Sequence, residues 1–259
     1  MRKILRSTIV KSVAGWAGRQ PFIWDGIYGS FDEVPVVGQG FASEEWLSDM
    51  ERYTRSAVAA IGNSSPVIPE NVPQHHALLA SLVTDQAVRV LDFGGGMGIG
   101  FANVKRCAFP ELEFEYVVVD NEESCARGRQ LLKDFSNVRF TTELPDESTR
   151  VDIIVLSGVL QFVEDYEELL AKLARFRPSQ WLFTFLPAGD IPTFVSAQRN
   201  VPGSILPAWF FNVGELVNRI ESLGYKLVFK SAHDRVFDMR NFPPTHQLHR
   251  QCNLLFRCA

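Results

Sequence analysis

Apolar segments alternate with amphipathic segments through the middle of this 259-residue chain. Short runs of Val, Ile, Leu and Phe have the length and composition of buried strands, and the segments between them place apolar residues at helical spacing. The predicted strands cover 88–93, 113–120, 137–142, 151–157, 180–187, 226–232 and 253–258. The predicted helices cover 98–108, 122–135, 166–176 and 213–225. This alternation indicates an α/β fold, with a mainly parallel sheet covered by helices on both faces.

The first 72 residues differ from the rest and are predicted to form an N-terminal extension that caps a domain formed by residues 73–259. Residues 21–47 are rich in Gly, Pro and aromatic side chains, which indicates irregular structure, and a helix is expected near 43–61. A linker that contains Ser and Pro, at 64–73, joins the extension to the α/β domain.

The N-terminus itself is basic and amphipathic. The first 19 residues contain five basic side chains and no acidic one, and one helical face carries Leu5, Ile9, Val13 and Trp16. A helix of this kind either docks on its own domain or lies on an anionic membrane surface. The segment is a poor secretory signal, because Lys11 interrupts its apolar region.

Composition and charge limit the partners of the chain. Apolar residues make up 46% and charged residues 22% of the sequence, as in ordinary soluble globular proteins. The net charge of −4 disfavours a general nucleic-acid binder. The four cysteines form no C-x-x-C pair, and His246 and His249 lack a third ligand. We therefore expect a cytoplasmic protein with reduced thiols and no metal site.

The segment VRVLDFGGGMGIG, Val88–Gly100, carries the most specific pattern in the chain. An apolar strand ends in Asp92 and is followed at once by a glycine-rich turn and the start of a helix. Glycines allow a sharp turn and a close approach to a ligand, and the helix presents free N–H groups. The spacing matches neither the dinucleotide fingerprint G-x-G-x-x-G nor the phosphate-binding loop G-x-x-x-x-G-K-[ST]. It matches D-x-G-x-G-x-G, with the acidic residue at position 92.

This pattern resembles the first motif of class I methyltransferases, which bind S-adenosylmethionine (SAM). The resemblance covers roughly residues 75–259 and implies a Rossmann-like, doubly wound sheet of seven strands whose last strand is antiparallel. In that family the glycine turn passes under the methionine part of the cofactor. The cofactor-binding residues that the resemblance implies here are Asp92, Gly94, Gly95, Gly96 and Gly98.

Further cofactor contacts are expected where the next strands end. Asp120 ends the second strand, and a carboxylate at that place can accept hydrogen bonds from both ribose hydroxyls. Asp is also a favoured helix N-cap, so this side chain has a structural alternative. In the family, the adenine lies beyond the third strand. The remaining candidates that the resemblance implies for the cofactor site are Asn121, Thr142, Glu143 and Ser157.

The catalytic residues are less clearly marked. Gln161 stands where related small-molecule methyltransferases often have a histidine, and a glutamine can position a hydroxyl group but cannot act as a general base. His75 and His76 precede the first strand and are candidates for that base, although each is also typical of a structural histidine. No [DN]-P-P-[YF] motif for methylating base amines follows the fourth strand.

An acceptor lid is expected near 190–212, after the fifth strand. This segment combines aromatic, amide and charged side chains, which suit the apolar faces and hydroxyl rim of a sugar ring. The alternative for the tryptophans is that they belong to the core. The substrate-binding candidates are Gln161, Asp190, Arg199 and Trp209, with Tyr28 from the extension.

Three further segments sharpen the resemblance: WDGIYGSFDEVP…GFASEEWL, VLDFGGGMG and LPAWFF. They are similar to an uncharacterised methyltransferase family of bacterial surface-polysaccharide gene clusters. This resemblance implies O-methylation of a sugar or glycan intermediate by a cytoplasmic enzyme, with residues 1–19 in peripheral contact with the inner membrane. Two alternatives stay open: a SAM-binding partner subunit without catalysis, and a nicotinamide-dependent oxidoreductase, which the glycine spacing disfavours.

Overall fold

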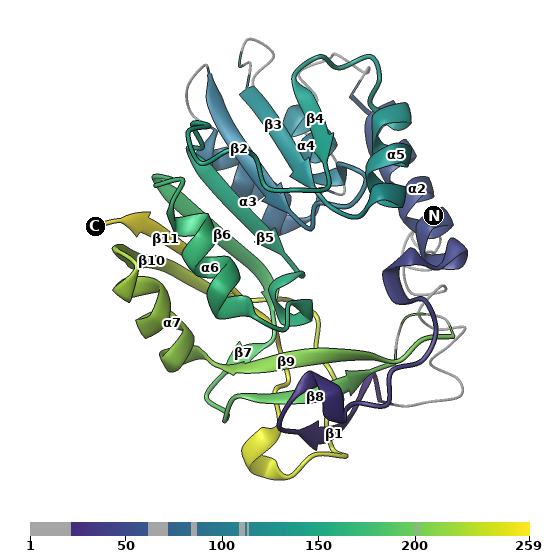
Figure 1. Cartoon of the computed structure of the whole chain (residues 1–259), viewed down its shortest axis with the longest axis vertical. Coiled ribbons are helices and arrows are strands. Elements are labelled where there is room, and N and C mark those ends of the chain that lie inside the picture. Colours follow the sequence, from purple (N-terminus) through teal and green to yellow (C-terminus); the bar gives the residue numbers. More distant parts are fainter. Residues whose placement is uncertain are drawn as a thin grey trace, which may run out of the picture.

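The computed structural model describes residues 22–61, 72–83, 87–108, 112, 114–199, 201 and 203–259. Its centre is a seven-stranded sheet (Figure 1). The strands follow one another across this sheet as β10 (Tyr225–Ala232), β11 (Cys252–Cys258), β6 (Gln180–Leu186), β5 (Ile153–Ser157), β2 (Val88–Phe93), β3 (Phe114–Val119) and β4 (Val138–Thr141).

The sheet is parallel except for its last strand. β2 pairs in parallel with β3 and β5, and the parallel pairing continues outward to β4 and β6. β11 runs antiparallel to both of its neighbours, β6 and β10. The predicted fold class and all seven predicted strands are therefore confirmed, and the antiparallel strand lies between the fifth and sixth strands in chain order.

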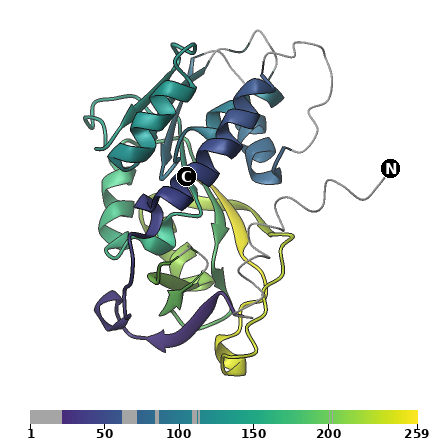
Figure 2. The ribbon, with the colours of Figure 1, turned by 90° about the vertical axis from the view of Figure 1, so that its right-hand side faces the viewer.

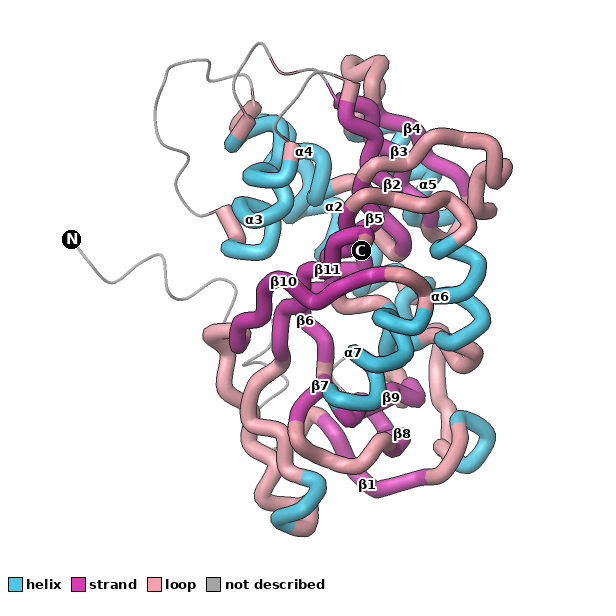
Figure 3. The backbone as a smooth tube through the Cα atoms, turned by 90° about the vertical axis from the view of Figure 1, so that its left-hand side faces the viewer, coloured by secondary structure: helices cyan, strands magenta, loops and turns pink. Residues whose placement is uncertain are grey.

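Helices cover both faces of this sheet, and each face has its own apolar core. One core contains side chains of α3 (Gln74–Leu82), α4 (Ile99–Cys107) and the residues just after α5 (Glu122–Leu131). The other contains side chains of α6 (Tyr166–Ala174) and α7 (Val213–Ser222). Figure 3 shows α3 and α4 on one side of the sheet and α6 and α7 on the other, as doubly wound folds require.

The expected helix of the extension is α2 (Glu44–Ala59), which packs on α4 and α5 (Figure 2). Its first turn is capped by the Ser43 hydroxyl, which accepts a hydrogen bond from the Trp46 backbone N–H. Arg127 of α5 forms ion pairs with two glutamates of α2, Glu44 and Glu51. The helix α2 is thus fixed beside α4 and α5, the helices that follow β2 and β3.

The structure also contains a second sheet, which the sequence analysis did not predict. Its strands follow one another as β1 (Trp24–Tyr28), β8 (Phe194–Gln198), β9 (Leu206–Asn212) and β7 (Ala188–Gly189). Residues 21–47 are therefore not wholly irregular, because β1 pairs with β8 along its length. The segment expected as a lid, 190–212, supplies the two middle strands of this sheet.

The second sheet lies across the carboxyl ends of the central strands (Figure 1). β9 packs against η3 (Leu160–Phe162), the short 3-10 helix that follows β5. The other short 3-10 helices are η1 (Phe31–Glu33), η2 (Gly40–Ala42) and η4 (Pro244–His246). Because ligands of doubly wound folds bind at the carboxyl ends of the strands, the second sheet lies on the same side of the central sheet as the expected site.

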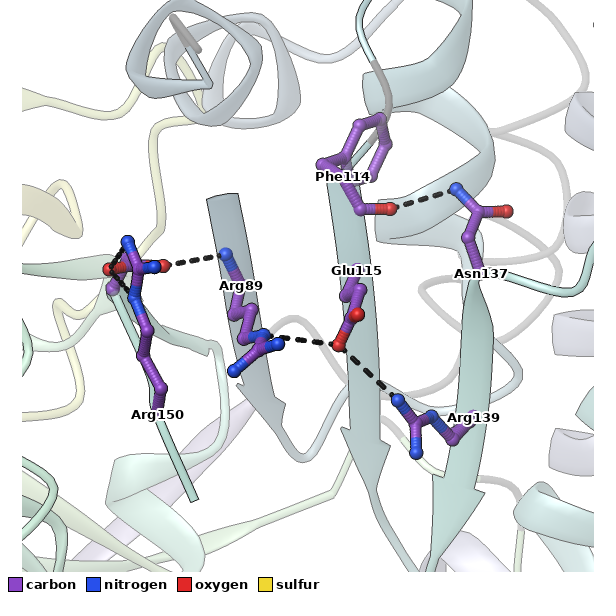
Figure 4. A network of polar contacts seen from close by, with 7 residues as sticks. Arg89, Phe114, Glu115, Asn137, Arg139 and Arg150 are labelled. Atoms are coloured by element: carbon purple, nitrogen blue, oxygen red, sulfur yellow. Dashed lines mark hydrogen bonds and ion pairs between the residues drawn. The ribbon is translucent and has the colours of Figure 1, made fainter. Parts of the chain in front are cut away.

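The opposite ends of the strands carry a surface network of charges (Figure 4). Glu115, the second residue of β3, pairs with Arg89 of β2 and Arg139 of β4, each over 3.2 Å. These side chains are half-exposed or exposed, and such pairs contribute little stability. The network lies away from the carboxyl ends, so we assign it no role in the site.

Two predictions fall outside the described residues. These are the basic N-terminal helix over 1–19 and most of the linker at 64–73. Among the helices of the described part of the chain, none is long and apolar enough to cross a membrane.

Candidate functional site

The turn between β2 and α4 is built on glycines in the left-handed region. The φ angles of Gly94, Gly96 and Gly98 are +73°, +59° and +83°, a conformation that residues with a Cβ rarely adopt. The backbone N–H of Gly96 donates to Oδ2 of Asp120 over 2.8 Å. The turn after the first strand is therefore joined to the end of the neighbouring strand.

The three glycines with positive φ differ in what a side chain at each position would meet. A Cβ at Gly94 would lie 2.3 Å from the side chain of Val159, and one at Gly98 would lie 2.7 Å from that of Leu132. A Cβ at Gly96 would have no atom within 4 Å. At this position the turn faces open space, as a surface that supports a ligand must.

Gly95 and Gly100 make room for a buried polar pair. A Cβ at Gly95 would lie 2.5 Å from Oδ2 of Asp92, and one at Gly100 would lie 2.5 Å from the hydroxyl oxygen of Tyr116. The Tyr116 hydroxyl donates to the same Asp92 oxygen over 2.7 Å. Oδ1 of Asp92 is buried and has no hydrogen-bond partner among the described residues. Burial raises the pKa of Asp92 to about 7, the Tyr116 hydrogen bond opposes this shift, and the charge of Asp120 adds to it.

Asp120 is not the cap of the helix that follows it. The N-cap of α5 is Asn121, whose side-chain oxygen accepts from the Ser124 backbone N–H over 2.9 Å. The Asn121 amide also donates to Oδ1 of Asp120. Asn121 therefore holds the carboxylate in place, and the capping alternative for Asp120 is removed.

The other expected cofactor residues lie at the same edge of the sheet. Thr142 and Glu143 follow β4 and are exposed. Ser157 ends β5 and accepts a hydrogen bond from the Thr184 hydroxyl of β6 over 2.8 Å. Their positions agree with an adenine and methionine site along this edge, and their contacts with a cofactor stay predictions.

Gln161 lies in η3 and is almost fully buried. Its side-chain Nε2 donates to the Gly158 carbonyl over 2.9 Å, which fixes the orientation of the amide. The amide oxygen, Oε1, is buried without a partner among the described residues. Gln161 can therefore offer a hydrogen-bond acceptor at the end of β5.

His76 is held by the core. Its Nδ1 lies 2.9 Å from Nδ2 of Asn103, whose oxygen accepts from Arg106, so the amide donates and Nδ1 accepts. The neutral ring then carries its proton on Nε2. Burial lowers the pKa of His76 to about 4. These contacts give His76 the surroundings of a structural histidine.

His75 has different surroundings. Its ring lies 4.0 Å from the ring of His76 and 4.4 Å from that of Phe185, between centroids. Neither ring nitrogen forms a hydrogen bond with another described residue. Burial, together with His76 and His233, lowers the pKa of His75 to about 2, so its ring is neutral at physiological pH.

Phe185, at the carboxyl end of β6, was not predicted as a site residue. Its φ of +52° is in the left-handed region, although it is not a glycine. Its ring also contacts the ring of His233, with centroids 4.3 Å apart, and its Cβ lies 3.4 Å from a Cβ built at Gly158. Phe185 therefore joins His75 to the loop that bears Gln161. No pattern in the sequence marks this residue, because Phe185 has the appearance of one more apolar strand residue.

The expected acceptor residues belong to the second sheet or its margins. Arg199 forms an ion pair with Asp25 over 2.9 Å, and the Trp209 indole N–H donates to the Glu164 carbonyl over 3.2 Å. Tyr28 is half-buried against the apolar cluster of this sheet, and Asp190 is exposed. Two of these side chains thus have internal partners, and their contact with an acceptor stays a prediction.

Comparison with known families favours the methyltransferase over the nicotinamide-dependent oxidoreductase. The sequence profile of a methyltransferase domain family matches residues 48–244, which is more than half of the chain. The chain belongs to this methyltransferase family. A comparison with curated protein sequences found no match to this methyltransferase.

Solved structures support the same fold. The methyltransferase superposes on the 1,6-didemethyltoxoflavin N1-methyltransferase of Burkholderia thailandensis with a TM-score of 0.52 and 17% identity, covering 87% of this chain and 95% of that one. A putative SAM-dependent methyltransferase of Listeria monocytogenes gives 0.52 and 10%, covering 72% and 99%. One from Clostridium acetobutylicum gives 0.50 and 9%, covering 73% and 93%. At these identities the likeness is one of fold.

SAM is the cofactor of the methyltransferase. The turn of residues 94–98, together with Asp92, Asp120 and Asn121, forms a surface, here called the cradle, that fits SAM. The open face of Gly96 would accommodate the methionine part, and the carboxylate oxygens of Asp120 would accept hydrogen bonds from the ribose. The unpartnered oxygen of Asp92 suits the cationic amino group of the cofactor, directly or through water. When bound, SAM supplies an electrophilic methyl group on a sulfonium.

Proposed function

We propose that this SAM-dependent methyltransferase methylates a hydroxyl oxygen of a sugar or glycan intermediate in surface-polysaccharide biosynthesis. The observation that carries the proposal is the fixed amide of Gln161. Its nitrogen is bound to the Gly158 carbonyl, so its buried oxygen is left to accept. A buried acceptor without a partner costs free energy, which a donor such as a sugar hydroxyl recovers on binding.

The side chains around Gln161 support an uncharged, hydroxyl-bearing acceptor. Phe185 and His75 offer ring faces that suit the C–H faces of a sugar. His75 is neutral, because the pKa of its ring is lowered to about 2, and it can accept a hydrogen bond from the reacting hydroxyl. Methyl transfer needs the nucleophile in line with the methyl group, so orientation by these groups supplies much of the rate. As the new C–O bond forms, the bond between the methyl group and sulfur would break and S-adenosylhomocysteine would leave, while the hydroxyl proton passes to His75 or to water.

The second sheet supports an acceptor that is bound under a cover. β9 packs on η3, and the Trp209 indole is hydrogen-bonded to the segment just after it. The second sheet therefore contacts the residues next to Gln161 directly, through β9. Such enclosure excludes water from the reacting groups.

The proposed context comes from the sequence. The segments that resemble the polysaccharide-cluster family lie in the extension, the cradle and β9. For an acceptor made at the inner face of a membrane, we propose a cytoplasmic location with peripheral membrane contact through residues 1–19.

The test is transfer of a labelled methyl group from SAM to a panel of nucleotide sugars and lipid-linked glycans, with the product analysed by mass spectrometry. We expect an O-methyl sugar from at least one member of the panel. Gln161→Ala should raise the acceptor KM and leave SAM binding unchanged. The control is Gln180→Ala, which removes a glutamine side chain at the first residue of β6, at the other end of the sheet from η3. Methylation of amines or proteins alone would overturn the proposal.

One observation favours a second candidate, a SAM-binding partner subunit without catalysis. The pKa values of both buried histidines are lowered, to about 2 and about 4, so neither is a strong base. Tight binding of S-adenosylhomocysteine (SAH) with no transfer to any acceptor class would support this candidate over the enzyme.

A further inference from the structure

Tyr116 lies in the middle of β3, fully buried between the sheet and α4. It is one strand away from Asp92, and its hydroxyl donates to Oδ2 of that carboxyl over 2.7 Å. The absence of a side chain at Gly100 is what admits the hydroxyl, since a Cβ there would lie 2.5 Å from it. The chain therefore keeps a polar contact in its core at the cost of a glycine inside a helix.

The turn beside Asp92 and the start of α4 carry no cationic side chain that could pair with its carboxylate. Residues 94–104, which form the turn and the start of α4, include no charged or titratable side chain, and neither does β5. Asp120, at the end of β3, has the same sign as Asp92 and disfavours its charge. Among the described residues, the Tyr116 hydroxyl is the one hydrogen-bond donor to the carboxyl, whose Oδ1 has no partner.

We propose that Tyr116 is a positioning residue for the cofactor, which orients the Asp92 carboxyl toward the cofactor amino group and couples SAM binding to release of a proton from Asp92. This inference rests on the cofactor and is independent of the acceptor proposed above. The cofactor ammonium supplies the cation that the buried carboxylate lacks. On binding, the proton leaves Asp92 for the buffer, and no other bond changes.

The coupling acts near neutral pH. Burial raises the pKa of Asp92 to about 7, so without cofactor roughly half of the carboxyl groups are protonated at that pH. Binding that requires the carboxylate then strengthens as pH rises through this value and levels off above it. Without the Tyr116 hydrogen bond, which lowers the pKa of Asp92, the transition moves to higher pH.

The experiment is calorimetric titration with SAH between pH 6 and pH 8.5, in two buffers that differ in ionisation enthalpy. At pH 7 we expect the wild type to release about half a proton. Tyr116→Phe should bind about tenfold more weakly at pH 7, release close to one proton, and approach wild-type affinity at pH 8.5. The ligand amino group titrates equally in all variants and cancels in the comparison.

Two further variants separate positioning from stability. Tyr225→Phe removes the hydroxyl of another buried tyrosine of the same sheet, on the distant strand β10, and should not change proton release. Asp92→Asn should abolish the pH dependence, and adding Tyr116→Phe to it should change SAH affinity little. Equal weakening by Tyr116→Phe at every pH, with unchanged proton release, would overturn the proposal. If Tyr116→Phe does not fold, a pH dependence that persists in Asp92→Asn overturns it instead.

Discussion

The backbone N–H of Gly96 donates to the carboxylate of Asp120 over 2.8 Å, so two segments that are distant in sequence form one surface. The Asn121 amide holds the other oxygen of this carboxylate. These hydrogen bonds between groups of the chain itself order the turn and the end of β3, which lowers the cost of ordering them when a cofactor binds.

Replacing Asp120 should weaken cofactor binding. Asp120→Ala removes the proposed acceptor for the ribose and the partner of the Gly96 N–H together. We expect at least a tenfold loss of SAH affinity, about 1.4 kcal/mol, by calorimetry. Asp120→Asn keeps one oxygen for Gly96 and should lose less. Asp146→Ala, in an exposed turn, is the control, and equal affinity of Asp120→Ala and the wild type would refute the ribose assignment.

Gly96 has a matched partner for a steric test. Gly96 and Gly203 have φ of +59° and +64°, and a Cβ at either position would have no atom within 4 Å. A valine at each should cost similar stability, about 1–3 kcal/mol, from backbone strain. Gly96→Val alone should abolish SAH binding, because its side chain occupies the open face of the turn. Normal binding by folded Gly96→Val would mean that the cofactor lies elsewhere.

The central sheet could be predicted because its strands have local signals. The apolar runs at 88–93 and 151–157 have the length of strands that are buried on both faces, and helical periodicity separates them. The second sheet has no such signal. β1 pairs with β8 about 170 positions later, as in the contact of Trp24 with Gln198. Pairing over that separation depends on the tertiary structure, so one half of the sheet was interpreted as irregular and the other as a lid.

We predict that the Tyr116 hydroxyl leaves no room for a side chain larger than that of glycine at position 100. Gly100→Ala should destabilise the fold by about 1–3 kcal/mol, because the new methyl group lies 2.5 Å from that oxygen. In the Tyr116→Phe background the nearest oxygen is gone, and part of the cost should disappear, while the contact of the new Cβ with Oδ2 of Asp92 over 2.9 Å remains. Urea unfolding of the four proteins in this cycle measures the coupling. Additive effects would show that the hydroxyl is not the obstacle.

The glycine motif predicts the cofactor site. The sequence alone does not show why each of these positions requires a glycine. Gly95 and Gly100 serve the buried pair of Asp92 and Tyr116, which only the register of β2 and β3 brings together. Phe185 was missed for the same kind of reason. Its contacts with His75 and His233 join three separate segments, and no spacing in the sequence relates them.

The two adjacent histidines should respond differently to replacement. His76→Ala removes the contact with Asn103 from the core and should lower the free energy of unfolding by about 1–3 kcal/mol. His75→Ala removes a ring without hydrogen bonds to described residues. It should lower kcat for the hydroxyl acceptor at least tenfold and leave SAH affinity unchanged. A His75→Ala enzyme with full kcat would remove this residue from the proposed mechanism.

The buried histidines also predict how stability depends on pH. The pKa of His76 is lowered to about 4 in the folded protein, from an ordinary value near 6.5. Below pH 6.5 the unfolded chain takes up a proton that the folded chain does not, so this contribution to stability is complete above 6.5 and is lost as pH falls toward 4. Asp92 acts in the opposite direction, because the folded state keeps its proton up to about pH 7.

Urea unfolding between pH 4 and pH 7.5 separates the two contributions. His76→Gln does not titrate, so the stability difference between wild type and variant should shrink as pH falls from 6.5 to 4. Gln39→Ala, which replaces an exposed side chain that does not titrate, is the control and should give a constant difference. Asp92→Asn should remove the opposing contribution and make the decline in stability at low pH steeper. A difference between wild type and His76→Gln that does not change with pH would show that His76 is protonated equally in the folded and unfolded states.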